Sequence, residues 1–394
     1  MRHFSSILRP ASRTTGRVLA LLAGAGAAVL LAGPAHAVTV APHPDPTATF
    51  NGTVLAIAYS GNTAYVGGEF TSAYTSGGGS AKRSYLAAVN ASNGALLSWQ
   101  PKADGKVRGL AVSGSTVYAV GDFTTVNGEG HRRVVALDAF SGTPRSGFDQ
   151  RIDGVVNTVA AGNGRLYVAG AITSVGGSAR AGAAALDLNT GAVDPGWTPA
   201  LAEGSAEALV LSGDRVYVGG TFRSVNGVSG SGKLAAIHST TGAVDKSFDA
   251  PVSVVAHALA VNGSTVYAAL GGQGGRAVAY SGTGTVQWIV TADGDVQAIG
   301  VAGDKVFLGG HFDKVCRSAR TGDMGRCLDG DDVRVKMAAV NSDGDLQPWA
   351  PNGNGVSGVH AVGVGASADR VAVGGAFTTI GGATHRRFAQ FSLS

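Results

Sequence analysis

The sequence predicts an all-β fold, a β-propeller of seven blades. A short strand pattern recurs seven times at intervals of about 50 residues, the length of a four-stranded blade. It ends in Gly-Gly in four copies and in Val-Gly, Ala-Gly or Ala-Leu in the other three. Gly is abundant, with 62 residues, and only 14% of the residues are charged, which suits short strands joined by tight turns. No long amphipathic helical pattern follows residue 37. The copies of the pattern begin at Tyr65, Tyr118, Tyr167, Tyr217, Tyr267, Phe307 and Ala372.

The repeating unit is clearest in residues 106–154. Its alternation of apolar and polar residues predicts strands at 107–112, 116–123 and 133–138, and a short fourth strand that ends at Phe148. Gly residues occupy the turns between these strands, because Gly accepts a positive φ without steric cost. The paired Gly residues of the second strand indicate a place where two backbones approach each other closely.

One aromatic residue marks the fourth strand of each unit except the last. The chain stops at Ser394, just after the third strand of the seventh unit. Phe50, followed by an Asn51-Gly52 turn, stands in the same local context as these aromatic residues. We therefore expect the N-terminal segment to supply the outer strand of the last blade and so to close the ring. The six aromatic residues are Trp99, Phe148, Trp197, Phe248, Trp288 and Trp349.

Residues 1–37 have the pattern of a secretory signal peptide. An Arg-rich start is followed by an apolar run at 18–31 and by Ala35-His36-Ala37, a small-x-small cleavage site. The apolar run is shorter than the roughly 20 residues of a membrane span. We expect cleavage before Val38, secretion, and a single propeller domain over residues 38–394.

The positive charge of the sequence belongs to this leader. The formal net charge is +4, and the leader holds four Arg residues and no acidic residue. The secreted chain is therefore balanced in charge, which gives no reason to expect nucleic acid or an anionic membrane as a partner. We expect a monomer.

The repeats resemble the delta-60 repeat propellers of secreted bacterial proteins. The residues that carry this resemblance are Gly219-Gly-Thr-Phe-Arg-Ser-Val-Asn-Gly227 and Ala184-Ala-Leu-Asp-Leu-Asn-Thr-Gly191, and it extends over residues 45–394. The resemblance implies the propeller fold and no settled activity. The fifth unit departs from it, because Leu270-Gly-Gly-Gln-Gly-Gly275 replaces the usual Phe-Thr loop.

The stretch Ala185–Trp197 is also similar to the tryptophan-docking repeat of quinoprotein dehydrogenases. In that family the motif is structural, and the quinone site often has adjacent cysteines. Cys316 and Cys327 are the two cysteines of this chain and are not adjacent. A quinone-dependent dehydrogenase is therefore a remote alternative, and we expect no cofactor.

A basic residue lies near the start of the third strand in every unit, at one of two positions two residues apart. Residues i and i+2 lie on the same face of a strand, so these side chains can form a cationic ring near one rim. The ring predicts a site for an anion or an acidic glycan. The alternative interpretation, which we favour because the set is repeated, pairs these residues with Glu69, Asp122 and other carboxylates. The first position holds Arg133, Lys233, Arg276, Lys336 and Arg387, and the second holds Arg83, Arg180 and Arg334.

Cys316 and Cys327 lie in the one long insertion of the repeat. Two cysteines in an exported chain predict a disulfide bond. A metal site built on the two cysteines would need further Cys or His ligands, and His311 alone lies nearby, so we expect no metal site there. The acidic residues of the insertion, Asp329, Asp331 and Asp332, do not match the spacing of an EF-hand loop, although a calcium site is conceivable.

These observations predict a secreted propeller that acts as an extracellular binding module, with a cell-wall glycan or a protein as its ligand. The second-to-third strand loops and the inter-blade turns vary most, so we place the ligand there, with the basic ring and His311 as rim candidates. No catalytic residue can be assigned. The alternative is a polysaccharide-active enzyme, a glycosidase or lyase, with two acids at the central funnel.

Overall fold

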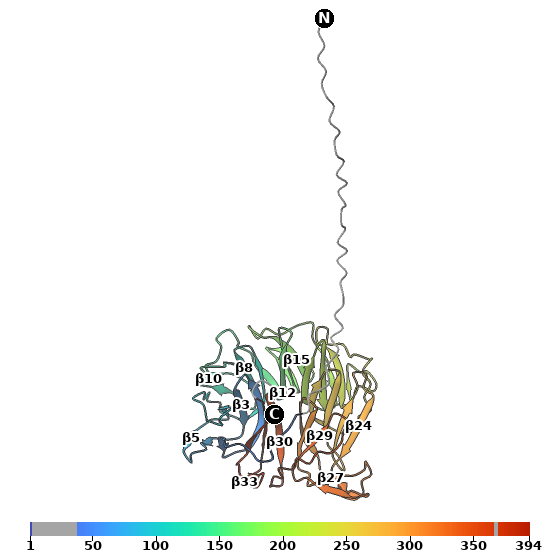
Figure 1. Cartoon of the computed structure of the whole chain (residues 1–394). Helices are drawn as coiled ribbons and strands as arrows, with labels where there is room; N and C mark the ends of the chain where they lie inside the picture. Colours follow the sequence, from blue (N-terminus) through green and yellow to red (C-terminus); the bar gives the residue numbers. More distant parts are fainter. Residues whose placement is uncertain (2–37, 366–368) are drawn as a thin grey trace. The chain divides into compact units, whose positions relative to one another are not determined.

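Short antiparallel strands make up nearly all of the regular structure (Figure 1). The computed structural model describes Met1, residues 38–365 and residues 369–394. Apart from Met1, the predicted signal peptide lies outside the described residues. Within them, the one helical element is the 3-10 helix η1 (Asp323–Gly325). No described segment forms a helix of the length and apolar character that a membrane span requires.

The strands form a repeated antiparallel unit in which a second strand lies between a first and a third. In the described residues the first strands are β2 (Val54–Ser60), β7 (Val107–Ser113), β12 (Ile152–Gly162), β17 (Ala206–Ser212), β21 (Ala256–Asn262), β25 (Val296–Ala302) and β30 (Val359–Gly365). The second strands are β3 (Thr63–Gly68), β8 (Thr116–Gly121), β13 (Arg165–Val175), β18 (Arg215–Gly220), β22 (Thr265–Leu270), β26 (Lys305–Gly310) and β31 (Arg370–Gly375). The third strands are β6 (Leu86–Asn90), β11 (Val134–Asp138), β15 (Ala183–Asp187), β20 (Leu234–His238), β23 (Arg276–Tyr280), β29 (Met337–Asn341) and β34 (Phe388–Ser392).

The fourth strand is weaker than the sequence predicts. It is a full strand only in the fifth unit of the described chain, as β24 (Val286–Thr291). Elsewhere single bridges replace it, such as Leu137 to Pro144 and Leu186 to Val193. Proline explains part of this, because it has no N–H to donate to the ladder.

The remaining strands are short and lie in the loops between second and third strands or beside them. They are β1 (Thr49–Phe50), β4 (Ser72–Tyr74), β5 (Ser80–Lys82), β9 (Thr125–Val126), β10 (Glu129–Gly130), β14 (Ser178–Ala179), β16 (Leu201–Ala202), β19 (Ser224–Val225), β27 (Lys314–Cys316), β28 (Asp331–Val333), β32 (Thr379–Ile380) and β33 (Ala383–Thr384).

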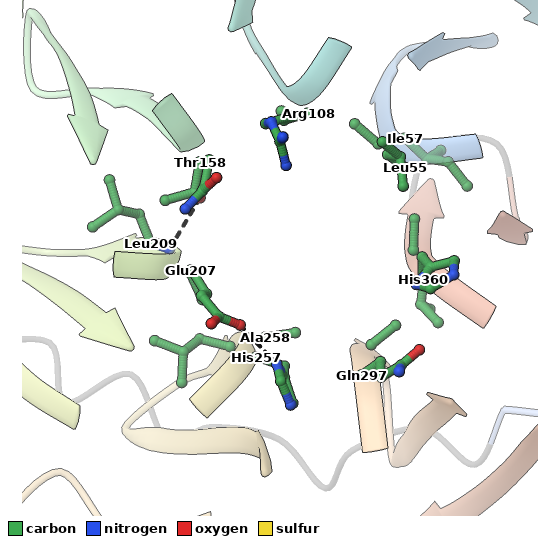
Figure 2. Close-up of a pocket in the computed structure, with 18 of the residues that line it drawn as sticks. Leu55, Ile57, Arg108, Thr158, Glu207, Leu209, His257, Ala258, Gln297 and His360 are labelled. Atoms are coloured by element: carbon green, nitrogen blue, oxygen red, sulfur yellow. Dashed lines mark hydrogen bonds and ion pairs between the residues drawn. The ribbon is translucent and has the colours of Figure 1, made fainter. Parts of the chain in front are cut away.

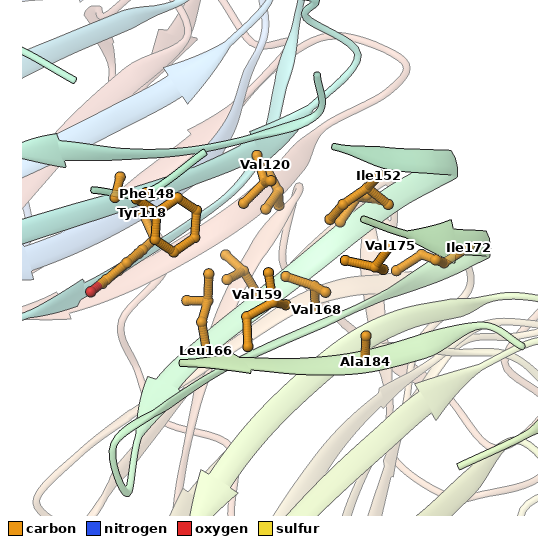
Figure 3. Packing of buried hydrophobic residues seen from close by; sticks show 14 residues of the cluster. Tyr118, Val120, Phe148, Ile152, Val159, Leu166, Val168, Ile172, Val175 and Ala184 are labelled. Carbon is orange, nitrogen blue, oxygen red and sulfur yellow. The ribbon is translucent and has the colours of Figure 1, made fainter. Parts of the chain in front are cut away.

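The core lies between neighbouring sheets. Figure 3 shows one such layer, where Val120 and Phe148 of the second unit face Val159, Leu166 and other buried residues of the third. Each first strand contacts the first strand of the next sheet, and β30 contacts β2 in the same way. Because every sheet buries both faces against neighbours, small Ala and Val side chains suffice to fill the layers.

An aromatic pair recurs in every unit of the described chain except the seventh, which has Ala372 at the second-strand position. The ring of the second strand meets the ring of the fourth segment, at centroid distances from 5.0 Å (Tyr65 and Trp99) to 5.9 Å (Tyr267 and Trp288). Hydrogen bonds from these side chains then reach the next sheet, as in Trp99 Nε1 to the Asp138 carbonyl oxygen at 3.0 Å. The aromatic residue of the fourth segment therefore links its own sheet to the next one.

The N-terminal segment runs antiparallel to β34. Val40 forms a bridge with Leu393, and Asp45 forms one with Gln390. Further along, the Phe50 N–H donates to the Arg386 carbonyl oxygen at 3.0 Å. The first described residues and the last thus lie side by side.

Candidate functional site

The first strands of the units share a β-bulge near their start. In each, the ladder to the second strand skips one residue, as between Val54 and Ala56 or between Ala206 and Ala208. A bulge leaves its extra residue unpaired and redirects the side chain. The seven bulged residues are Leu55, Arg108, Asn157, Glu207, His257, Gln297 and His360, and all of them line one hollow. We call these seven residues the mouth.

In every unit but the fifth, Gly at the last position of the repeated pattern leaves room for the backbone at this bulge, and the fifth unit forms the bulge with Leu270 there. A Cβ on Gly68 would lie 2.1 Å from the Thr53 carbonyl oxygen, just before the bulge, and the equivalent position of Gly121 has the same clearance from Lys106. The first Gly of the pair has another role, because a Cβ on Gly67 would lie 2.6 Å from Val107 of the next sheet. The predicted close approach is therefore present at both glycines. Gly68 lies against the backbone of its own sheet, and Gly67 lies against a side chain of the next sheet.

An aliphatic layer lies next to the mouth in the same hollow, which has an empty volume of about 700 Å³. Its side chains stand two residues further along each first strand. They are Ile57, Leu110, Val159, Leu209, Leu259, Ile299 and Val362, and Figure 2 shows part of both layers. We call this layer the throat. The site is thus a mixed polar ring beside an apolar one, which is the general character of small-ligand sites.

One ion pair and one carboxylate–imidazole contact organise the mouth. Arg108 donates to both carboxylate oxygens of Asp122, at 3.0 Å and 2.9 Å. Glu207 Oε2 lies 2.7 Å from His257 Nδ1 on the neighbouring strand. The second contact joins two sheets whose residues are 50 apart in sequence. A carboxylate at Nδ1 orients the imidazole ring and sets which nitrogen carries the proton.

The fifth unit makes room for His257. A Cβ on Gly271 would lie 2.5 Å from His257 Nε2, so only glycine fits there without a shift. The departure of this unit from the repeat therefore has a local structural consequence at the mouth. Two buried polar atoms of the mouth, His257 Nε2 and Gln297 Oε1, have no hydrogen-bond partner within the described protein.

His360 is held in its neutral form by its surroundings. Burial lowers its pKa below the ordinary histidine value, and nearby His311 lowers it further, while Glu69 acts in the opposite direction. Burial dominates because a charged imidazolium loses its hydration there. A neutral imidazole both donates and accepts hydrogen bonds, so His360 adds to the polar capacity of the mouth.

The predicted basic ring lies elsewhere. Of its members and His311, none lines the hollow in the part of the chain that the structure describes. Arg83 is buried and donates to the Lys82 and Leu97 carbonyl oxygens at 2.8 Å. Arg180 and Arg334 repeat this arrangement, each with one bond to the preceding residue and one to the fourth segment.

The other position of the basic set has an unusual backbone. Arg133, Lys233, Lys336 and Arg387 have φ between 66° and 69°. Their side chains donate to carbonyl oxygens of Gly154, Thr221, His311 and Ala376, respectively. Arg276, by contrast, is part of the β23–β24 ladder opposite Thr291.

The two carboxylates named as partners of this set have other partners. Glu69 pairs with Lys106 and Asp122 with Arg108, so neither carboxylate serves the basic set. Backbone carbonyl oxygens accept the hydrogen bonds of most of these side chains, because irregular backbone nearby has carbonyl groups that need donors. Lys336 is an exception, since it also contacts Asp313 at 2.7 Å.

The disulfide prediction is confirmed. Cys316 and Cys327 are bonded, with their Cα atoms 5.2 Å apart. The bond closes a hairpin whose strands β27 and β28 pair Cys316 with Asp331. The acidic residues of the insertion face basic ones, as Asp329 faces Arg320 and Asp332 faces Arg317. Within the described residues, no three His, Cys, Asp or Glu side chains gather closely enough to hold a metal ion.

The number of carboxylates in the hollow is relevant to the alternative of a polysaccharide-active enzyme. Among the described residues that line it, Glu207 is the one acid, and it is engaged with His257. Paired acids on opposite sides of a scissile bond are the usual requirement of glycoside hydrolysis. The lining therefore offers hydrogen-bonding groups of several kinds in place of an acid pair.

Comparisons with solved structures identify the fold. The chain is similar to the computationally designed Ika8 protein (13% identity, TM-score 0.50, covering 89% of this chain and 99% of that one). It is also similar to the WD40 β-propeller domain of Doa1 (10% identity, TM-score 0.54, 89% and 96% covered). A third match is the β-propeller domain of Cps50 (Swd1) from Myceliophteria thermophila (9% identity, TM-score 0.53, 90% and 99% covered). The chain therefore has a β-propeller fold.

Comparisons by sequence identify no relative. No family model matches the chain, and no curated protein matches it either. The similarity to the solved structures lies at 13% identity or below, and it concerns the fold alone.

Proposed function

We propose that residues 38–394 form one seven-bladed β-propeller and that residues 38–50 complete the last blade. Trp349 supports this closure. The indole N–H of Trp99 donates to the third-to-fourth strand turn of the following sheet, and that of Trp349 donates to Ala41 at 3.0 Å. The N-terminal segment thus takes the place of that turn.

Contacts between the last sheet and the first support the same proposal. A Cβ on Gly374 would lie 2.3 Å from Val54, which repeats the relation of Gly67 to Val107. Arg370 donates to the Ala91 carbonyl oxygen at 3.1 Å, as Arg165 does to the Ser239 carbonyl oxygen at 2.7 Å. The same inter-sheet contacts therefore recur across the junction.

We propose that the protein is exported and acts outside the cell as a binding module of the delta-60 repeat type. The leader pattern of residues 1–37 supports export, and the Cys316–Cys327 bond is of a kind that persists in oxidising compartments. The repeat motifs around Gly219 and Ala184 support the relation to delta-60 propellers.

The ligand binds at the mouth in this proposal. The observation that carries it is the contrast between the bulged position and its neighbours. The residues before the bulge are all Val or Ala, and the residues after it are all Ala, Gly or Thr. The bulged position itself holds six different residue types in seven copies. Variation confined to one aligned position on a rigid scaffold indicates recognition rather than packing.

The chemistry of the mouth favours an uncharged, hydroxyl-bearing ligand. The charge of Arg108 is paired with Asp122, and the Glu207 carboxylate is engaged by the imidazole of His257. What remains is the side-chain oxygen of Asn157, whose amide nitrogen donates to Ser205 and Ala206, together with the polar groups of Gln297 and His360, next to an aliphatic throat. A neutral glycan or its terminal sugar presents both hydroxyl groups and apolar C–H faces, which matches this combination.

The test is a binding screen of the secreted protein on an array of extracellular and cell-wall saccharides. For any saccharide bound, Gln297→Ala and Asn157→Ala should each weaken binding about tenfold, which corresponds to 1.4 kcal/mol. Arg223→Ala is the control, because Arg223 is 74% exposed and does not line the hollow.

Two outcomes contradict the proposal. Binding that is equally strong in both mouth variants places the ligand elsewhere on the protein. New reducing ends or unsaturated sugars in the same samples, measured over time, identify the polysaccharide-active enzyme instead.

A further inference from the structure

The backbone nitrogen of Val38 lies against a carboxylate at the far end of β25 from the mouth. Val38 N donates to Asp304 Oδ1 at 2.7 Å. Asp304 is in the turn between β25 and β26, and its other oxygen, Oδ2, lies 2.5 Å from Lys305 Nζ. Both side chains are largely buried, with 17% and 14% of their surface exposed. The Asp304 carboxylate thus already accepts a hydrogen bond from Val38, the residue that we expect to be first after cleavage.

The chain around Val38 is held in place. The Thr39 N–H donates to the Ser394 carbonyl oxygen at 2.7 Å, and the Ser394 N–H donates back to Thr39 at 2.9 Å. This pairing holds the residue after Val38 in place and so keeps Val38 close to Asp304. Asp369 lines the same hollow as Val38, and Lys305 contacts Asp304, so these two residues supply the other charged side chains near the Val38 nitrogen.

We propose that cleavage of the Ala37–Val38 bond creates a positively charged terminus that binds Asp304 and locks the closing strand onto the last blade. This inference rests on the proposed export of the protein. A signal peptidase hydrolyses the peptide bond with one water, which leaves a carboxylate on Ala37 and an ammonium group on Val38. The neutral N–H that contacts Asp304 becomes a cation at the same place, and a charge-assisted hydrogen bond is about twice as strong as a neutral one.

The pKa of Asp304 is consistent with this role. Burial acts to raise it, but hydrogen bonds from Lys305 and from the Val38 N–H outweigh burial, so the pKa lies below the ordinary value. The carboxylate is therefore charged at neutral pH and available to an ammonium group. The equivalent turn of the fourth unit has Asp214 at the matching position, far from the chain ends.

The experiment uses the full chain, expressed with its leader in a secreting host. The secreted protein is sequenced from its N-terminus, and the rate at which an amine-reactive ester labels the α-amino group is measured at pH 7. An ion pair raises the pKa of the α-amino group, and a rise of one unit lowers its reactive fraction about tenfold. We expect Val38 as the first residue and labelling about tenfold slower than in Asp304→Asn.

Two further variants complete the design. Asp214→Asn is the matched control and should label as slowly as the wild type. Insertion of Gly-Ser between Ala37 and Val38 keeps Asp304 but displaces the new terminus, so labelling should be fast even if Asp304→Asn does not fold.

Equal labelling rates in the wild type and the insertion variant, or a first residue other than Val38, would overturn the inference. Saccharide binding at the mouth, measured on the same samples, distinguishes this failure from failure of the proposed function. Loss of the ion pair with binding retained rejects the inference alone.

Discussion

Single residues at the bulges give the site its chemistry, and His360 is the one whose protonation the structure decides. Burial, together with His311, holds its pKa below the ordinary value of about 6.5, against the effect of Glu69. A histidine whose pKa is lowered by folding contributes stability above its unfolded pKa. That stability is lost as the pH falls through the lower, folded value.

Removal of the Glu69 charge should lower the His360 pKa further. In Glu69→Gln the one influence that raises this pKa is gone, so an NMR titration of the imidazole protons should show a more acidic midpoint than in the wild type. Glu203→Gln, a change at a carboxylate 69% exposed in another sheet, should leave the midpoint unchanged. A higher midpoint in Glu69→Gln contradicts the assignment.

Gly271 is a second residue with a sharp expectation. A Cβ at this position would lie 2.5 Å from His257 Nε2, so Gly271→Ala should displace the imidazole and break its contact with Glu207. We expect a loss of about 1–3 kcal/mol in the free energy of unfolding, the usual cost of overpacking. Urea denaturation measures it. Gly77→Ala is the control, since a Cβ there meets nothing within 4 Å; an equal, small effect of both changes would show that the fifth unit tolerates a side chain.

Among the elements, the β27–β28 hairpin depends most on a covalent bond. Its loop is rich in charge, and Met324 and Val333 are exposed at 91% and 56%, so few apolar contacts hold it. The disulfide closes a loop with a sequence separation of 11. The main effect of the disulfide is therefore to keep this hairpin ordered.

Replacement of both cysteines by serine should destabilise the hairpin by about 2–3 kcal/mol, from the entropy of closing a loop of this length. Limited proteolysis should then cut within residues 317–330, while the oxidised protein resists at this site. An intact mass that corresponds to two free thiols in the secreted wild type would contradict the bond itself. A reduced protein as resistant as the oxidised one would show that the hairpin holds without it.

On the scale of the whole molecule, the proposed ring closure rests on Phe50, which lies far in sequence from some of its partners. Phe50 is fully buried, and its ring lies 4.3 Å from Phe70 and 5.8 Å from Phe388, measured between centroids. Its contacts thus join the beginning of the chain, the first sheet and the last.

Phe50→Ala should lower the free energy of unfolding by about 3–5 kcal/mol, the usual cost of deleting a buried aromatic side chain. Phe140→Ala is the matched control, because Phe140 is 94% exposed and the change should stay within about 0.5 kcal/mol. Chemical denaturation of both variants measures the difference. A Phe50 variant as stable as the Phe140 variant would rule out the closing role of this segment.

The repeated features of the fold could be read from the sequence because they are local. The predicted strands at 107–112, 116–123 and 133–138 correspond to β7, β8 and β11, and the two cysteines are bonded as predicted. Strand alternation, turn glycines and this cysteine pair each depend on residues that are close in sequence, so the sequence alone reveals them.

The sequence by itself determined the β-propeller repeat, its Gly-Gly pairs and its disulfide, whereas only the tertiary structure decided where the polar mouth lies. A bulge shifts the register by one residue, which no alternation of residue types signals in advance. Aligning the first strands by their Gly-Gly pairs brings Leu55, Arg108 and their counterparts to one position, but only the arrangement of the strands around one hollow makes them a site. The basic set did not indicate the hollow for a related reason. Most of its members donate to backbone carbonyl oxygens, which every residue possesses and which no residue type in the sequence marks.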